Sequence, residues 1–177
     1  SVGFDLYLKL VEDMVKDIRG KKSDPRIETE LDLMVKGFIP KDYVPDLNQR
    51  LDFYRRMQVA SEYDEGLAIA SELEDRYGPH PESVAKLLAL LEIRMLCQRI
   101  HISKIELKHN DACLHLLPST AINPQILTSL FDERLSMQSE YKIKIRLDRK
   151  GWKTDLKLVK NYLQKLAHSL LPVEEEN

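Results

Sequence analysis

The sequence predicts an α+β fold, in which a helical N-terminal half is followed by a small mixed sheet with flanking helices. Apolar residues recur at helical spacing through most of the first half, whereas several short segments of the second half alternate between apolar and polar residues. No long flexible linker separates the two parts. We therefore expect one domain over 1–171, helical over 1–100 and mixed over 101–171, with a disordered acidic tail at 172–177.

The N-terminal 45 residues contain one helical pattern and two extended ones. Residues 4–18 carry apolar side chains at helical spacing, and a polar loop with a proline follows at 21–26. Alternating apolar residues predict a strand over 30–35. Two prolines exclude helix over 37–45 and are expected to hold that segment extended.

Two successive helices are predicted from their start signals. Asp46, with Gln49 three residues later, is a capping-box pattern for a helix through residue 60. Ser61 with Asp64 repeats this start signal for a helix through residue 77. Gly78 then ends the helix, and we expect it to adopt a positive φ.

A third helix is predicted over 81–99, with Pro81 in its first turn. The apolar arc of this helix is wide, so we expect it to be the central buried helix. Cys97 lies on it, and the apolar surroundings favour a small core residue over a nucleophile.

The pattern changes after His101, where short alternating segments and turn signals replace helical spacing. The expected elements are a hairpin of 102–108 and 113–117 around Asn110-Asp111, a short helix over 123–131, a strand over 141–147 and a final helix whose apolar positions span 156–166.

No motif for catalysis or cofactor binding is present. The chain lacks a phosphate-binding glycine loop, a nucleophile elbow and a Cys-x-x-Cys pair. His109, Asp111, Cys113 and His115 are close in sequence, but turn and strand residues explain this segment as well as a metal site does. We expect a non-enzymatic chain with no catalytic, cofactor-binding or metal-binding residues. No apolar run of about 18 residues occurs, so no membrane span is expected either.

Charge is unevenly distributed along the chain. Lysine and arginine total 27 against 29 aspartates and glutamates, for a net charge of −2, which argues against a dedicated nucleic-acid domain. Residues 61–82 hold seven acids and one base, whereas residues 142–165 hold nine bases and two acids. Within the acidic stretch, Glu72 and Asp75 are three residues apart on one predicted helix, a spacing suited to receive an arginine from another surface.

Several motifs, in order, resemble the C-terminal domain of the bacterial transcription-repair coupling factor. The resemblance extends from residue 1 to about residue 168 and diverges over 132–150. The segments that carry it are Val2-Gly3-Phe4-Asp5-Leu6-Tyr7, Phe38-Ile39-Pro40, Tyr43-Val44-Pro45-Asp46, Tyr54-Arg55-Arg56, Glu72-Leu73-Glu74-Asp75-Arg76-Tyr77-Gly78 and Asn123-Pro124.

The resemblance implies a regulatory rather than a catalytic role. A protein of this family is an ATP-dependent DNA translocase that removes RNA polymerase stalled at DNA lesions and recruits nucleotide excision repair through UvrA. In this family, ATP and magnesium are bound by an upstream motor, so the resemblance implies no cofactor in this chain. It also implies that the chain is a fragment of a cytoplasmic bacterial protein. In the family, this last domain packs on a UvrB-like module and masks its UvrA-binding surface. Glu72, Asp75 and Arg76 match the positions of that interface. We expect a monomer that contacts polymerase and duplex DNA only through other modules.

An alternative interpretation is a nucleic-acid-contacting domain that uses the basic stretch 142–165. The candidate contacts to nucleic acid or a partner are Lys142, Lys144, Arg146 and Lys153. Trp152 and Tyr162 could add base stacking. Alternating lysines are also typical of a solvent-facing strand.

Overall fold

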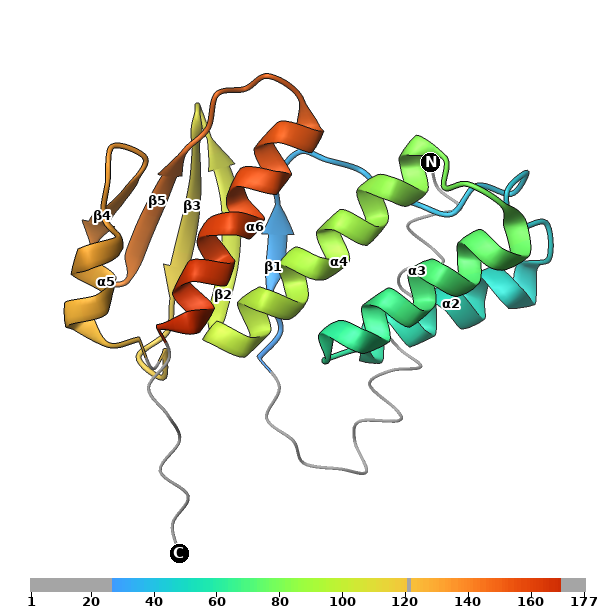
Figure 1. Cartoon of the computed structure of the whole chain (residues 1–177), viewed down its shortest axis with the longest axis horizontal. Helices are drawn as coiled ribbons and strands as arrows, with labels where there is room; N and C mark the ends of the chain where they lie inside the picture. The colour runs from blue at the N-terminus through green and yellow to red at the C-terminus, as the bar shows by residue number, and fades with distance from the viewer. Residues whose placement is uncertain (1–26, 121, 170–177) are drawn as a thin grey trace, which may run out of the picture. The chain divides into compact units, whose positions relative to one another are not determined.

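The computed structural model describes residues 27–120 and 122–169, and it confirms an α+β fold with a mixed five-stranded sheet (Figure 1). The helix predicted over 4–18 and the tail predicted at 172–177 lie outside the described residues. The chain divides into two compact units, which over the described residues are 36–95 and 27–35 together with 96–169. The predicted first strand therefore belongs with the later sheet. A single domain over 1–171 stays a prediction.

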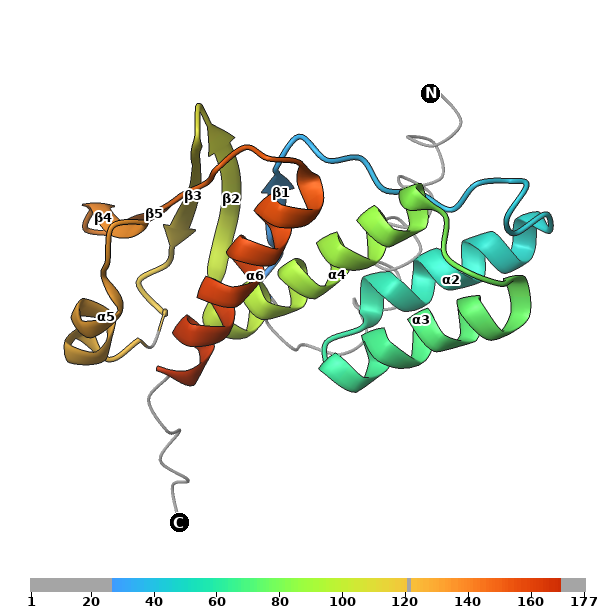
Figure 2. The same cartoon turned by 45° about the horizontal axis from the view of Figure 1, so that its top comes forward.

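The first unit is helical. It contains α2 (Leu47–Val59), α3 (Tyr63–Tyr77) and the first part of α4 (Glu82–Ile100), and α2 and α3 lie side by side (Figures 1 and 2). All three helices contribute to one buried apolar cluster, which stabilises the unit by removing apolar surface from water. The buried members are Ile39, Val44, Phe53, Tyr54, Met57, Ala60, Ile69, Leu73, Val84, Leu91 and Met95.

Helix α2 starts where the sequence predicts, and helix α3 starts one residue later than predicted. The Asp46 carboxylate accepts a hydrogen bond from the Gln49 amide at 2.8 Å, so the predicted cap of α2 is confirmed. The start predicted at Ser61 is wrong by one position, because Glu62 is the N-cap of α3. The Glu65 carboxylate reaches back to accept from the amides of Ser61 and Glu62, at 2.7 and 3.0 Å.

The segment before α2 is tied to the end of α3 by a tyrosine. Residues 40–44 form a turn, in which the Val44 amide donates to the Pro40 carbonyl at 3.0 Å, so the expected extended run is interrupted there. This turn presents the Tyr43 hydroxyl to the carbonyls of Leu73 and Gly78, at 3.1 and 2.8 Å. Gly78 has a φ of +87°, which confirms the positive φ expected of the residue that ends α3.

The second unit is built on the sheet, in the order β1-β2-β3-β5-β4. β1 pairs parallel with β2, and the other pairs are antiparallel, so the sheet is mixed as predicted. The predicted hairpin is confirmed as β2 and β3. β4 was not predicted, and it pairs irregularly with β5. The strands are β1 (Glu30–Asp32), β2 (Ile102–Lys108), β3 (Asp111–Leu116), β4 (Leu135–Ser139) and β5 (Lys142–Arg146).

Alternation along the strands separates an apolar sheet face from a charged one. Register places the fully buried Ile105, Leu114 and Ile143 across from one another on neighbouring strands. Helix α6 (Trp152–His168) lies across this face of the sheet and contributes buried apolar residues to it (Figures 1 and 2). The short helix α5 (Pro124–Leu130) begins after Asn123, whose side chain caps it as predicted.

The opposite sheet face holds a charge network centred on Glu106. Its carboxylate contacts Lys108 and His115, both at 2.9 Å, and Lys104 at 3.4 Å. Hydrogen bonds from Lys108 and then from His115 lower the pKa of Glu106 to about 2. This glutamate therefore remains ionised far below the pH at which an ordinary carboxyl group takes up a proton.

Substituting Gly37 should destabilise the first unit by steric overlap. An added Cβ would lie 2.2 Å from the backbone nitrogen of Leu87 and 2.4 Å from its Cα, so α4 would have to move. We expect Gly37→Ala to cost about 1–3 kcal/mol in unfolding free energy. Gly78→Ala is a useful comparison, because an added Cβ there meets no atom within 4 Å and only the positive φ strains it. Urea unfolding measures both variants, and a Gly37→Ala chain as stable as wild type would contradict the close approach.

The pH dependence of stability should reveal the Glu106 network. Because the folded-state pKa lies below the ordinary value of 4.5, the stabilisation by Glu106 is present above that value and is lost as the pH falls toward about 2. We expect wild type to lose more stability over this range than Glu106→Gln does. Urea midpoints measured from pH 5 to pH 2 test this, with Glu140→Gln as a control that removes an exposed carboxylate. Parallel losses in Glu106→Gln and wild type would refute it.

Candidate partner-binding site

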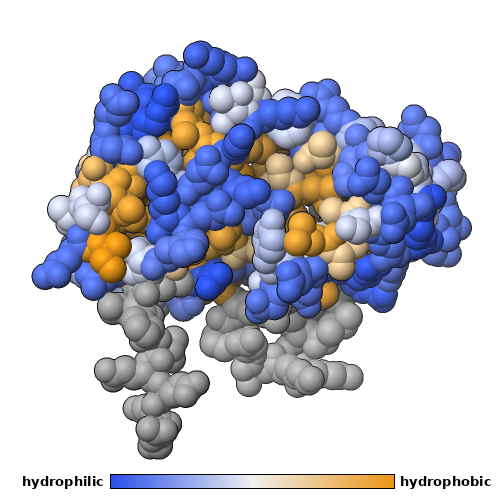
Figure 3. Space-filling view, viewed as in Figure 1, coloured by the Kyte–Doolittle hydropathy of each residue, from blue (hydrophilic) through white to orange (hydrophobic). Residues whose placement is uncertain are grey.

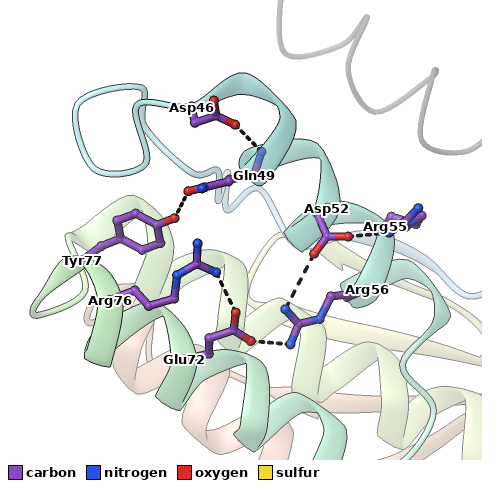
Figure 4. A network of polar contacts seen from close by, with 8 residues as sticks. All are labelled: Asp46, Gln49, Asp52, Arg55, Arg56, Glu72, Arg76 and Tyr77. Carbon is purple, nitrogen blue, oxygen red and sulfur yellow. Dashed lines mark hydrogen bonds and ion pairs between the residues drawn. The ribbon is translucent and has the colours of Figure 1, made fainter.

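The predicted acidic residue Glu72 lies between two arginines of this same chain (Figure 4). One carboxylate oxygen accepts from Nη2 of Arg56, on α2, at 2.6 Å. The other accepts from Nη1 of Arg76, one turn further along α3, at 2.8 Å. Glu72 therefore links α2 to α3, and both of its oxygens are already engaged.

Aromatic rings hold the two guanidinium groups in place. Arg56 and Arg76 lie over the Phe53 ring, with Cζ 5.3 and 5.6 Å from the ring centre, and Arg76 also lies 5.1 Å from the centre of Tyr77. Phe53 is 1% exposed, so it is a fixed platform from the core. These cation–π contacts restrict both arginines beside the carboxylate that they bind.

The electrostatics of the site follow from this arrangement. The hydrogen bond from Arg56, and then that from Arg76, lowers the pKa of Glu72, although partial burial acts in the opposite direction. The same bond to Glu72 raises the pKa of Arg56. The triad of Arg56, Glu72 and Arg76 is therefore fully charged at neutral pH and carries a net positive charge.

Polar contacts extend the network along α2. Asp52 forms an ion pair with Arg55 and lies 3.8 Å from Arg56, and Gln49 accepts a hydrogen bond from the Tyr77 hydroxyl (Figure 4). The second half of the capping box predicted for Gln49 is therefore replaced by a contact to α3. Together these contacts make one polar surface of α2 and α3, which we call the α2–α3 network.

Asp75 differs from Glu72 although both lie on α3. Asp75 is exposed and makes no ion pair with any residue in 27–120 or 122–169. Leu73, between them, is fully buried, and Tyr77 packs against Tyr43 and Phe53. Of the two predicted carboxylates, Asp75 is therefore the exposed one that no described residue pairs with.

Arg56 is the residue of the site that the sequence interpretation did not single out. It lies 16 residues before Glu72 and on another helix, so no helical spacing connects them. The available signal was the Tyr54-Arg55-Arg56 segment, which contributed to the family resemblance without indicating this contact.

The structure divides the basic candidates between two surfaces. Lys142, Lys144 and Arg146 follow one another on the charged sheet face, and Arg146 is bound to Asp111 at 2.5 Å. Lys153 is exposed on α6, which covers the opposite face of the sheet. Tyr162 is only 5% exposed and donates a hydrogen bond to an aspartate, so it has no free face for base stacking.

A metal site and a membrane-spanning helix each place requirements on the described residues. Within 27–120 and 122–169, no three histidine, cysteine or carboxylate side chains converge as metal ligands. His115 instead contacts Glu106, and Cys113 is buried. Burial raises the pKa of both cysteines, including Cys97 in α4. Over the same part of the chain, no helix has the length and apolar character needed to cross a membrane.

Comparison with known proteins gives a consistent result. The transcription-repair-coupling factor of Escherichia coli (strain K12) is 27% identical over 180 residues, which is 97% of this chain and 16% of that protein. The protein of the same name from Myxococcus xanthus is 43% identical over 97 residues, which is 54% of this chain and 8% of that protein. This chain thus spans a small part of these relatives.

Structure comparison supports the same fold. The crystal structure of the C-terminal domain of a transcription-repair coupling factor matches with a TM-score of 0.74 at 17% sequence identity, covering 83% of this chain and 96% of that one. The sequence model of the family described as TRCF domain matches residues 33–127, which include α2, α3, α4 and the hairpin of β2 and β3. The chain therefore belongs to the TRCF domain family.

Proposed function

We propose that this chain is a non-catalytic regulatory domain of a bacterial, cytoplasmic transcription-repair coupling protein. In this proposal it packs on a UvrB-like module of the same protein and masks the surface that binds UvrA. The whole protein would be an ATP-dependent DNA translocase that removes RNA polymerase stalled at lesions. The other modules of that protein would bind ATP, magnesium, polymerase and duplex DNA. This domain would hold those modules in a repressed state.

The observation that carries the proposal is the exposed Asp75 beside the α2–α3 network, in a chain of the TRCF domain family. Asp75 presents a carboxylate in the last turn of α3, where an arginine of a partner can bind it with two parallel hydrogen bonds. Glu72 serves the interface differently, because its oxygens hold Arg56 and Arg76. It orients two cations toward acidic or carbonyl groups of the partner.

A polar surface suits an inhibitory contact that has to open. Interfaces between domains of one chain are moderate in size and more polar than obligate ones. Charged pairs give such a contact specificity, and they favour release when a competing ligand changes the balance between two states. The α2–α3 network has this mixed-charge character and lies on helices fixed by the buried cluster.

Binding of this chain to the separately purified UvrB-like module tests the proposal. We expect Asp75→Ala to weaken binding by at least about tenfold, because it would leave a partner arginine unpaired in the interface. Glu74→Ala is the matched control, since it removes a neighbouring exposed acid from the same helix. Calorimetry or biolayer interferometry provides the affinities.

A comparison of Glu72→Ala with Asp75→Ala separates a role in the interface from a role in the stability of the fold. Glu72→Ala should lose both affinity and thermal stability, because Arg56 and Arg76 lose their shared acceptor. Asp75→Ala should keep wild-type stability. If Asp75→Ala binds the module as tightly as wild type does, the residue has no part in the interface and the proposed docking surface is wrong.

A further inference from the structure

An open groove between α5 and α6 forms a second candidate surface in the sheet-containing unit. Its volume is about 590 Å³. None of the residues that line it carries a carboxylate. They come from α5, from α6 and the residue after it, and from the residue before β4. They are Ile126, Leu130, Arg134, Leu158, Asn161, Tyr162, Gln164, Lys165, His168 and Ser169.

The side of this groove that α5 forms is apolar, and its side chains are exposed or half-buried. Helix α5 has no buried residue, although Ile126, Leu127 and Leu130 give it an apolar face. Ile126 is 43% exposed. Figure 3 shows hydrophobic surface over α5 beside the hydrophilic face of α6. A helix that leaves all its aliphatic residues partly in water is a typical docking element.

The α6 side of the groove is basic. The one acid of α6, Asp155, is buried and bound to Arg149 at 3.1 Å, so the outward face of the helix presents no carboxylate. Its exposed residues are Lys153, Thr154, Lys157, Asn161, Lys165 and His168.

One of the exposed lysines of α6, Lys165, lines the groove together with His168. Lys165 lies over the Tyr162 ring at 4.9 Å, and His168 follows one turn later. Lys165 also interacts with Asp132, which does not line the groove. Arg134 is already paired with Asp148 at 3.0 Å, so Lys165 supplies the positive charge for a ligand.

We propose that the α5–α6 groove binds a short acidic segment of a partner protein, with aliphatic side chains against α5 and carboxylates against α6. Charge complementarity selects the acidic residues, and the exposed aliphatic floor selects their apolar neighbours. A nucleic acid would use the lysines but not Ile126 or Leu130, and the buried Tyr162 offers it no stacking surface. This surface lies in a different unit from the α2–α3 network, so it does not depend on the proposed autoinhibition.

Fluorescence anisotropy of the whole 177-residue chain with labelled probes tests this inference. The main probe is a synthetic helix of about three turns, with leucine along one face and glutamate elsewhere. Comparison probes replace glutamate with lysine, replace leucine with serine, or consist of single-stranded DNA. We expect the acidic leucine helix to bind at least about tenfold more tightly than each of the others.

Matched variants locate the binding. Ile126→Ser and Lys165→Glu should each weaken binding of the acidic leucine helix by about tenfold. Met137→Ser and Lys153→Glu are the controls, since they change an exposed apolar residue and an exposed lysine outside the groove and should have little effect.

Other outcomes would overturn the proposal. These are no binding of the acidic leucine helix, equal effects of the groove and control variants, or tighter binding of DNA that Ile126→Ser does not change. A chain ending at Ser169 should bind the probe as wild type does. A clear gain in affinity would instead make the acidic C-terminal residues of this chain the occupant.

Discussion

Alternation along the strands determines where the charges of the second unit can lie. Because successive side chains of a strand point to opposite faces, Ile143 and Ile145 of β5 can be buried under α6 only if Lys142, Lys144 and Arg146 face away. The basic stretch 142–165 is therefore not one surface, since its β5 residues and its α6 residues lie on opposite sides of the sheet. The same constraint directs the apolar side of α6 inward and leaves its outer side basic.

In the first unit, the carboxylate of Glu72 determines which charged groups are already paired. Glu72 satisfies two guanidinium groups that aromatic rings already restrict, so α2 and α3 share a charged contact above their apolar cluster. A carboxylate with both oxygens occupied by fixed donors is a poor acceptor for a new arginine, whereas the exposed Asp75 makes no ion pair with any residue that the structure describes. The chemical equivalence of Glu72 and Asp75 in the sequence therefore does not persist in the fold.

Local signals predicted much of the secondary structure. Asp46 and Asn123 cap helices as expected, and Gly78 ends α3 with a positive φ, because these features depend on hydrogen bonds and dihedral angles within a few residues. The start of α3 differed because Glu65, rather than Asp64, supplies the carboxylate that accepts from the amides of Ser61 and Glu62. β4 was not recognised, since its sequence Leu-Ser-Met-Gln-Ser contains no β-branched residue and its strand conformation depends on pairing with β5.

By itself, the sequence determined the α+β class, most helices, the hairpin, the family resemblance and the acidic residues worth attention. These rest on periodicity, caps and ordered motifs, which act over short stretches of chain. Only the tertiary structure decided that Thr29 bonds to the carbonyl of Ile102, 73 residues away, and that residues 27–35 join the later sheet. It also decided that Arg56 binds Glu72 and that Asp75 is exposed, with no ion pair to another described residue. Such pairings depend on which elements pack together, because the free energy of long-range contacts comes from burial and complementarity that no local pattern encodes.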